Sequence, residues 1–257
     1  MSLAGKIVII TGASSGVGRA TAIKAASEGA VLALGDMNLS GLGETVGQCR
    51  AASSTSTTTE TTPSHLQFML DVGSTDDWDS FVKAVMDAFG KIDCVFNCAG
   101  INPTAISTEK ISDAVWDKMV NTNLKGVFNA TRACLPYMKS GSAFVNVSSV
   151  AGLHPVPELA LYCATKHAVI GFSKSVALEV GPRGIRVNVV APGMVDTPTN
   201  SAVRAGREAV DRAAESVGLR RFGTAEEVAE VVVFLLEERS RYMNGSVVEV
   251  HGGIGVQ

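Results

Sequence analysis

A glycine-rich turn between a short apolar run and a helical segment constrains the fold of this chain more than any other feature. Residues 6–10 (Lys-Ile-Val-Ile-Ile) are a nearly continuous β-branched run, typical of a parallel strand buried on both faces. The run leads into Thr11-Gly12-Ala13-Ser14-Ser15-Gly16-Val17-Gly18, and residues 19–29 have helical character. In this context glycines let the backbone approach a pyrophosphate, and the helix N-terminus offers free N–H groups to its charge. The turn therefore predicts a dinucleotide site; a purely structural turn is the alternative.

The residue at the end of the next predicted strand indicates which dinucleotide is bound. The strand at 31–35 is followed by Asp36, 20 residues after Gly16. A carboxylate at this place accepts hydrogen bonds from the adenosine ribose hydroxyls and repels a 2′-phosphate. No arginine or lysine follows Asp36 directly, and Ser15 rather than a basic residue precedes Gly16. We therefore expect NAD as the cofactor and NADP as the less favoured choice; a turn residue at a strand end is the simpler interpretation of Asp36.

Strand-like and helical patterns alternate along the whole chain, which predicts an α/β fold with a parallel sheet. The expected strands cover residues 6–10, 31–35, 66–70, 92–96, 143–147, 185–190 and 246–250, and the expected helices 19–29, 78–89, 111–138, 160–180, 199–217 and 226–236. A chain of 257 residues suits one large α/β domain or two small ones. We predict a single doubly wound (Rossmann) domain over residues 1–257, with a seven-stranded, mostly parallel sheet and helices on both faces.

Composition and charge exclude several classes of protein. Hydrophobic residues make up 46% of the chain and charged residues 18%, so a sizeable core can form. The formal net charge is −3 and there is no basic run, which argues against a nucleic-acid partner. The longest apolar stretch, residues 228–236, is far shorter than a membrane span, and the N-terminus has no signal-peptide pattern. We therefore expect a cytoplasmic protein with no membrane partner.

The cysteines and a Ser/Thr-rich stretch are expected to be structural; a role for Cys163, which adjoins Tyr162, and phosphorylation of the stretch are the alternatives. The five cysteines have no metal-like spacing, so we expect no metal site. Residues 51–64 are a low-complexity Ser/Thr stretch that cannot bury an apolar face, and we expect a surface loop there.

Tyr162 and Lys166 stand four residues apart in the helical segment 160–180 and therefore share one face of that helix. A free tyrosine has a pKa near ~10, and an adjacent ammonium favours the phenolate, so we expect a lowered pKa for Tyr162. Such a tyrosine can carry a proton near neutral pH. Ser149 follows the predicted strand 143–147, 13 residues before Tyr162, at the strand end that faces the ligand crevice in open parallel sheets. Chance occurrence of the Tyr–Lys pair is the alternative.

Asn123 lies within the helical segment 111–138, among mostly apolar residues. An asparagine there is costly unless its amide is paired. It is therefore either a structural bridge to backbone or water, or part of a site.

Taken together, these motifs resemble those of the short-chain dehydrogenase/reductase family, in its compact single-domain branch, over essentially the whole chain. The matching features are Thr11-Gly12-x-x-x-Gly16-x-Gly18, Asp36, Asp71-Val72, Asn97-x-Ala99-Gly100, Asn123, Ser149, Tyr162-x-x-x-Lys166 and Pro192-Gly193. Cys98 is a small departure from the family's Asn-Asn-Ala-Gly motif.

The resemblance implies a role for each of four catalytic residues. Tyr162 would be the general base for alcohol oxidation and the general acid for ketone reduction. Lys166 would hold the nicotinamide ribose and lower the pKa of Tyr162. Ser149 would hydrogen-bond the reacting oxygen, and Asn123 would hold a water that links Lys166 to solvent.

The resemblance also implies the set of residues that bind the cofactor. In this set Asp71 would meet the adenine, and the Val195 backbone and Thr197 would hold the nicotinamide carboxamide. The full set is Gly12, Ser14, Ser15, Gly16, Val17, Gly18, Asp36, Asp71, Val72, Asn97, Ala99, Gly100, Tyr162, Lys166, Pro192, Gly193, Val195 and Thr197.

The segment 160–180 is apolar on more of its surface than a sheet alone would bury, so a second subunit could cover it. The resemblance suggests a homotetramer, with a dimer possible; a monomer with an apolar helix is the alternative. It also assigns a substrate lid to residues 194–222.

The substrate is constrained only in its general character. His154 lies in the loop between Ser149 and Tyr162, and with Met194 it completes the expected substrate contacts. Leu153 and Val156 beside it predict a mostly apolar pocket. We expect an oxidoreductase that transfers a hydride between NAD(H) and a neutral, moderately bulky secondary alcohol or ketone. The alternatives are an NADP-dependent ketone reductase, and a non-redox or sensor protein that binds dinucleotide without net turnover.

Overall fold

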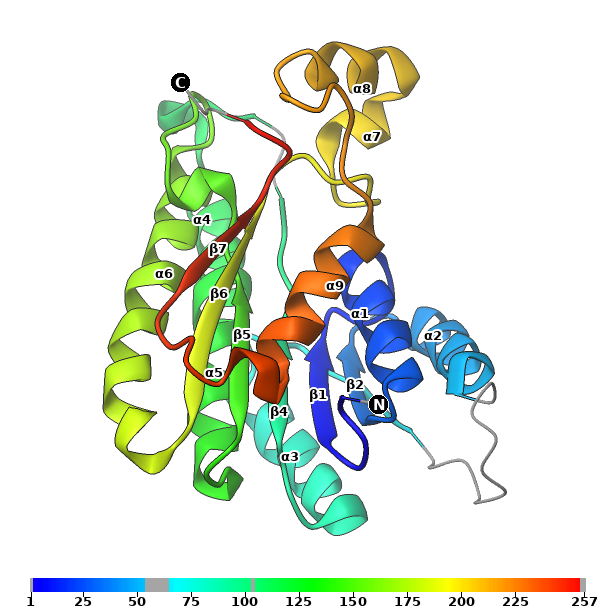
Figure 1. The fold of residues 1–257 in the computed structure, drawn as a ribbon. Coiled ribbons are helices and arrows are strands. Elements are labelled where there is room, and N and C mark those ends of the chain that lie inside the picture. The colour runs from blue at the N-terminus through cyan, green and yellow to red at the C-terminus, as the bar shows by residue number, and fades with distance from the viewer. Residues whose placement is uncertain (1, 54–64, 103–104, 255–257) are drawn as a thin grey trace.

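The protein is built around one sheet of parallel strands (Figure 1). The computed structural model describes residues 2–53, 65–102 and 105–254. Within these ranges seven strands pair in the order β3-β2-β1-β4-β5-β6-β7, and every pairing is parallel. The strands are β1 (Ile7–Thr11), β2 (Val31–Asp36), β3 (Leu66–Met69), β4 (Cys94–Asn97), β5 (Ala143–Val147), β6 (Arg186–Pro192) and β7 (Val247–Val250). The predicted doubly wound α/β fold with a seven-stranded sheet is confirmed.

Helices cover both faces of this sheet. They are α1 (Gly16–Ser27), α2 (Leu39–Ser53), α3 (Thr75–Phe89), α4 (Asp113–Val120), α5 (Gly126–Cys134), α6 (Ala160–Val180), α7 (Ser201–Ala205), α8 (Arg207–Ala214) and α9 (Ala225–Leu236). Apolar side chains of α1, α2 and α9 form one core cluster, and those of α3, α5 and α6 form the other. In the part of the chain that the structure describes, no helix is long and apolar enough to cross a membrane.

The central strand β1 explains why the first apolar run is continuous. Val8 and Ile10 pack into the cluster with α1, α2 and α9, whereas Ile7 and Ile9 pack into the cluster on the opposite face. Alternate side chains of a strand point to opposite faces, so a strand covered on both sides needs apolar residues at every position.

Several predicted boundaries differ from the observed ones. Helix α1 begins at Gly16 rather than residue 19, and α2 was not predicted because its glycines and polar residues mask its apolar face. The predicted helix 111–138 is divided by a π-helical turn at Asn121–Lys125. Of the predicted loop 51–64, residues 51–53 end α2, and residues 54–64 lie outside the described residues.

A buried polar chain fixes the carboxyl ends of β4 and β5 to helix α6. Asn97 Nδ2 donates to Asn146 Oδ1 at 2.8 Å, and Asn146 Nδ2 donates to Ser173 Oγ at 2.9 Å. The Ser173 hydroxyl donates in turn to the Val169 carbonyl at 2.6 Å. Asn146 and Ser173 are both fully buried, so each polar group here depends on its protein partners. This chain sets the depth at which α6 packs on the sheet.

Replacing Ser173 by alanine should therefore destabilise the protein by about 1–3 kcal/mol, because the Asn146 amide loses an acceptor in a place that water does not reach. Denaturant unfolding measures the difference. Ser175→Ala, at an exposed serine of the same helix, is the control and should change stability by less than about 0.5 kcal/mol. Equal effects of the two substitutions would show that the buried chain is not stabilising.

Candidate active site

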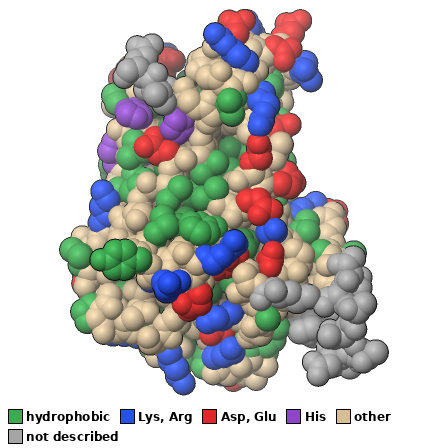
Figure 2. All heavy atoms as spheres, in the orientation of Figure 1, with side chains coloured by type: hydrophobic (Ala, Val, Ile, Leu, Met, Phe, Trp, Pro, Cys, Tyr) green, Lys and Arg blue, Asp and Glu red, His purple; other side chains and the backbone are tan. Residues whose placement is uncertain are grey.

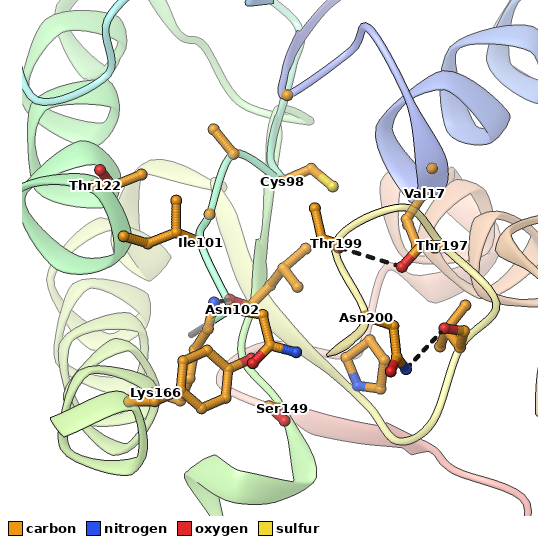
Figure 3. A pocket seen from close by; sticks show the side chains of 18 of the residues that line it. Val17, Cys98, Ile101, Asn102, Thr122, Ser149, Lys166, Thr197, Thr199 and Asn200 are labelled. Atoms are coloured by element: carbon orange, nitrogen blue, oxygen red, sulfur yellow. Dashed lines mark hydrogen bonds between the residues drawn. The ribbon is translucent and has the colours of Figure 1, made fainter. Parts of the chain in front are cut away.

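A cleft of about 640 Å³ opens at the carboxyl edge of the sheet, where the strand order reverses between β1 and β4. Its volume lies in the range of small-molecule and cofactor sites. Figure 3 shows Ser149 and Lys166 on one side of the cleft and Thr197, Thr199 and Asn200 on the other. The predicted residues that line it are Gly12, Ser14, Ser15, Gly16, Val17, Asp36, Asp71, Val72, Ala99, Gly100, Ser149, Tyr162, Lys166, Pro192, Gly193, Met194, Val195 and Thr197.

The glycine-rich turn after β1 forms one end of this cleft. Gly12 and Gly16 have φ values of +67° and +52°, a conformation that favours glycine. A Cβ atom on Gly12 would lie 2.9 Å from the Ala99 backbone, and one on Gly18 would lie 2.1 Å from the Gly12 carbonyl oxygen. The turn can therefore pack against both α1 and the loop after β4 only without side chains at these positions.

Helix α1 starts in this turn without a side-chain cap. Ser15 is its N-cap residue, and the Ser15 side chain makes no capping hydrogen bond. The first N–H groups of a helix have no partner within the helix, and together with the helix dipole they attract an anion. An uncapped N-terminus on a glycine-lined cleft fits the pyrophosphate of a dinucleotide.

Asp36 at the end of β2 is held in a fixed orientation. Its Oδ2 atom accepts a hydrogen bond from the Ser14 N–H at 3.1 Å, and its Oδ1 atom accepts one from the Asn38 N–H at 2.9 Å. Because backbone groups hold both oxygens, the carboxylate lies ready at the cleft wall. Asp71, farther along the same wall, accepts from the Gly73 N–H at 2.8 Å.

Ser149, Tyr162 and Lys166 come from two neighbouring elements that are locked together. Ser149 follows β5 and caps the turn Val150–Gly152, with its Oγ atom accepting from the Ala151 N–H at 3.1 Å. Ser148 Oγ donates to the Lys166 carbonyl at 2.8 Å, which ties this turn to α6. Lys166 Nζ donates to the Val147 carbonyl at 3.0 Å and lies 5.7 Å from the centre of the Tyr162 ring.

Burial is the main cause of the pKa shifts of Lys166 and Tyr162. Desolvation lowers the pKa of Lys166 to about 8, because the ammonium is buried beneath the cleft. Desolvation raises the pKa of Tyr162, and the Ser149 hydroxyl acts in the opposite direction. The expected lowering of the Tyr162 pKa is therefore wrong for this structure. Because part of the Lys166 population is neutral near pH 8, Lys166 favours the phenolate form of Tyr162 less strongly than a permanent cation would.

Asn123 lies beneath the cleft rather than in its wall. Its Oδ1 atom accepts from the Ile101 N–H at 2.8 Å, and its Nδ2 atom donates to the Ile101 carbonyl at 3.0 Å. It sits in the π-helical turn, a local distortion that is frequent at functional sites. A Cβ atom on Gly100 would lie 3.3 Å from Asn123 Oδ1 and 3.6 Å from Lys166 Nζ. Both groups therefore border the space that a side chain at position 100 would fill.

Four residues of the predicted site do not line the cleft. His154 is exposed on the loop after β5, and its substrate contact stays a prediction. Asn97 belongs to the buried chain with Asn146, and Gly18 packs on Gly12. Like Asn123, these two residues support the wall from behind.

Other lining residues were not predicted as site residues. Leu159 lines the cleft near Tyr162, beside Val156, which the sequence did predict for the pocket; its spacing of three residues before Tyr162 could have indicated Leu159 too. Met37, Ile101, Asn102, Lys118, Thr122, Thr199 and Asn200 also line it. Asn200 Nδ2 donates to the Val195 carbonyl at 3.0 Å, a contact that no sequence motif indicates.

Within the described ranges, no three His, Cys, Asp or Glu side chains gather closely enough to hold a metal ion. The five cysteines, all of which lie in these ranges, are free thiols.

The whole chain is similar to known reductases and dehydrogenases. Residues 12–255 match a family model described as enoyl-(acyl carrier protein) reductase. The 3-oxoacyl-[acyl-carrier-protein] reductase FabG of Thermotoga maritima is 38% identical over 257 residues, with 99% of each chain covered. The crystal structure of levodione reductase has a TM-score of 0.89 at 36% identity and covers 97% of each chain. A short-chain dehydrogenase from Burkholderia cenocepacia in complex with NADP has a TM-score of 0.89 at 29% identity, covering 98% of this chain and 99% of that one.

The buried Lys166 predicts a specific pH dependence of stability. Because its pKa is lowered on folding, the folded protein binds this proton less tightly than the unfolded chain does, so its contribution to stability rises with pH above about 8. The free energy of unfolding of Lys166→Met minus that of the wild type should fall by about 2 kcal/mol between pH 8 and pH 10.

Denaturant unfolding of both proteins across this pH range measures that difference. The buried thiols of Cys49, Cys94 and Cys134, whose pKa values burial raises, affect both proteins alike and cancel. Lys174→Met removes an exposed ammonium from the same helix and should give a constant difference. A constant difference for Lys166→Met as well would contradict the buried, desolvated ammonium.

Proposed function

The chain belongs to the short-chain dehydrogenase/reductase family, and from this premise we propose that it transfers a hydride between NAD(H) and a secondary alcohol or ketone. One observation carries the proposal. Ser149, Tyr162 and Lys166 converge on the same cleft as the glycine-rich turn and the uncapped N-terminus of α1. A proton carrier and a dinucleotide site in one cleft are the two parts that this reaction needs. The nicotinamide, when bound, supplies or accepts the hydride.

Each catalytic side chain contributes one part of the proton chemistry. The Tyr162 hydroxyl donates a proton to the carbonyl oxygen during reduction and takes it back during oxidation. The Ser149 hydroxyl donates a hydrogen bond to the same oxygen and stabilises the charge that develops on it. Lys166 holds the nicotinamide ribose and adds positive charge 5.7 Å from the phenol ring. Asn123 holds the loop at Ile101 and orients a water toward Lys166.

NAD is the proposed cofactor, and the support lies at the end of β2. The Asp36 carboxylate faces the cleft with both oxygens fixed by backbone N–H groups, where it accepts from the ribose hydroxyls. A 2′-phosphate beside it would bring two negative groups together. The similar protein from Burkholderia cenocepacia was solved with NADP, so the alternative for this chain is NADP-dependent reduction.

The substrate end of the cleft supports a neutral, moderately bulky molecule. Val156, Leu159 and Met194 give it apolar walls, and Met194 and Val156 remain partly exposed for contact with a ligand. Residues 194–222, which include α7 and α8, are the proposed substrate lid and project beyond the carboxyl edge of the sheet (Figure 1). Apolar walls with few charged anchors favour a ketone or alcohol over a phosphorylated sugar.

We also propose a cytoplasmic homotetramer, with a dimer as the alternative. Trp116, Phe128 and Leu178 on α4, α5 and α6 are 53%, 41% and 80% exposed. Figure 2 shows a second group of hydrophobic side chains on the face formed by β6, β7 and α9. Two separate apolar faces on one chain can pair with two different neighbours, as a tetramer with dihedral symmetry requires. Sedimentation equilibrium tests this, and a monomer mass would refute it.

Tyr162→Phe should lower turnover by about 100- to 10,000-fold, because the variant keeps the ring but has no proton to transfer. NADH formation across a panel of secondary alcohols measures this, and NADH binding should change by less than about twofold. Tyr137→Phe, at an exposed tyrosine, is the control and should leave turnover unchanged. Full activity of Tyr162→Phe would exclude the proposed mechanism, and a wild type inactive with every alcohol and ketone would favour the sensor alternative.

Asp36→Ala should reduce the preference for NAD over NADP by at least about tenfold in kcat/KM, because it removes a charge that a 2′-phosphate would meet. Steady-state kinetics with both cofactors measure the ratio. Asp79→Ala removes an exposed carboxylate from α3 and controls for the change in net charge. An unchanged ratio in Asp36→Ala would remove Asp36 from cofactor selection.

A further inference from the structure

Arg19, in the first turn of α1, makes four hydrogen bonds behind the glycine-rich turn. Its Nη2 atom donates to the Ser14 carbonyl at 2.5 Å, to the Gly41 carbonyl at 3.2 Å and to Glu44 Oε2 at 2.8 Å. Its Nε atom donates to Thr45 Oγ1 at 3.0 Å. One guanidinium therefore joins the turn after β1 to the first half of α2, which is the fork geometry that only arginine provides.

Thr45 extends this connection to the neighbouring carbonyl of the turn. It is fully buried, and its hydroxyl lies 2.9 Å from the Ala13 carbonyl and 2.9 Å from the Gly41 carbonyl. A Cβ atom on Gly41 would lie 2.8 Å from Ser14 Cβ, so α2 touches the turn directly. The Ala13 and Ser14 carbonyls both point toward α2 as a result.

Because the Ala13 and Ser14 carbonyls are held against α2, the backbone N–H groups on the cleft side of the turn are held in place as well. In a trans peptide the N–H points opposite to the carbonyl, so a Ser14 carbonyl held by Arg19 turns the Ser15 N–H away from α2. The N–H of Ser14 itself donates to Asp36. Ser14 is therefore held on one side by Arg19 and on the other by the carboxylate proposed to select the cofactor.

The charge of Arg19 is already matched within this network. Only Ser14 separates its guanidinium from the Asp36 carboxylate, which places the two charges within about 10 Å. Glu44 lies 2.8 Å from the guanidinium and offsets its charge. A 2′-phosphate near Asp36 would therefore find a cation that is paired and turned away from the cleft.

We propose that Arg19 is a positioning residue for the adenosine half of the dinucleotide: by holding the Ser14 carbonyl directly and the Ala13 carbonyl through Thr45, it fixes the Ser14 N–H that holds the Asp36 carboxylate in place for the ribose. This rests on the proposed function, since it concerns the same site. It assigns to Arg19 an effect on the affinity and selectivity for the cofactor, and none on the proton chemistry at Tyr162.

The test is calorimetric binding of NAD, NADP and ADP-ribose to Arg19→Gln, with steady-state kinetics alongside. We expect binding of NAD and ADP-ribose to weaken by about tenfold or more, and the preference for NAD over NADP to fall, because several charge-assisted bonds are lost together. The kcat at saturating NAD and the KM for the alcohol substrate should not change. Arg50→Gln removes an exposed arginine from α2 and is the matched control.

Two further variants separate geometry from charge. Arg19→Lys keeps the charge but lacks the fork, so it should behave like Arg19→Gln; full recovery of NAD affinity would overturn the positioning role. Glu44→Gln leaves the carbonyl contacts of Arg19 and releases its charge, so NADP should bind several-fold more tightly. Unchanged NADP affinity in Glu44→Gln would overturn the charge-matching part of the proposal.

The remaining outcomes are also decisive. Equal losses for NAD and NADP, or a lower kcat with unchanged NAD affinity, would make Arg19 a general structural residue and overturn the proposal. If Arg19→Gln does not fold, Thr45→Val removes the hydroxyl that joins Arg19 to Ala13 and should shift NAD affinity in the same direction. ADP-ribose binding needs no turnover, so an enzyme inactive on alcohols would refute the proposed function and leave this test valid.

Discussion

Parallel pairing of every described strand is the constraint on which the rest of the structure depends. It brings the carboxyl ends of all these strands, where the candidate site residues lie, to one edge of the sheet. Beside β1 the strand order reverses, and the connections on the two sides of this point diverge. The loops after β1 and β4 leave in different directions but remain connected, since the Thr11 hydroxyl accepts from the N–H groups of Cys98 and Ala99 at 3.1 Å each. The strand topology alone therefore produces the cleft, whichever residues line it.

This topology also explains how a buried lysine is tolerated. Moving an ammonium from water into the protein costs free energy, and the lowered pKa of Lys166 is the measure of that cost. One hydrogen bond to the Val147 carbonyl offsets part of it, and the two hydrophobic clusters on either face of the sheet supply the rest of the stability. A large core can therefore support a destabilising group at a site of function.

The sequence predicts those parts of the structure in which local pattern and tertiary environment agree. Strands such as β1 and β5 were recognised because burial on both faces demands continuous apolar runs, and the glycine-rich turn because close backbone approach demands glycine. Helix α2 was missed because contacts with Arg19 and Ser14 hold its N-terminal half, and helical periodicity does not encode such contacts. The direction of the Tyr162 pKa was wrong because spacing reveals the neighbouring ammonium but not the burial that outweighs it. The exposure of His154 could not be predicted either, because residue spacing does not fix the course of a loop.

The two ends of the cleft are built by different physical means, and this limits what similarity to other proteins can say about the substrate. Strand ends and backbone N–H groups form the proposed cofactor end, whereas side chains on the loops before α6 and after β6 form the proposed substrate end. On the first loop Glu158 has a φ of +61°, and its carbonyl accepts from the Ile106 N–H at 2.9 Å. The next residue, Leu159, is the N-cap of α6 without any capping side chain. Both depart from what a helix start prefers. Such departures persist where the surroundings require them. We therefore infer that Leu159 occupies the N-cap position because of the shape of the pocket beside Tyr162, and not because it stabilises α6.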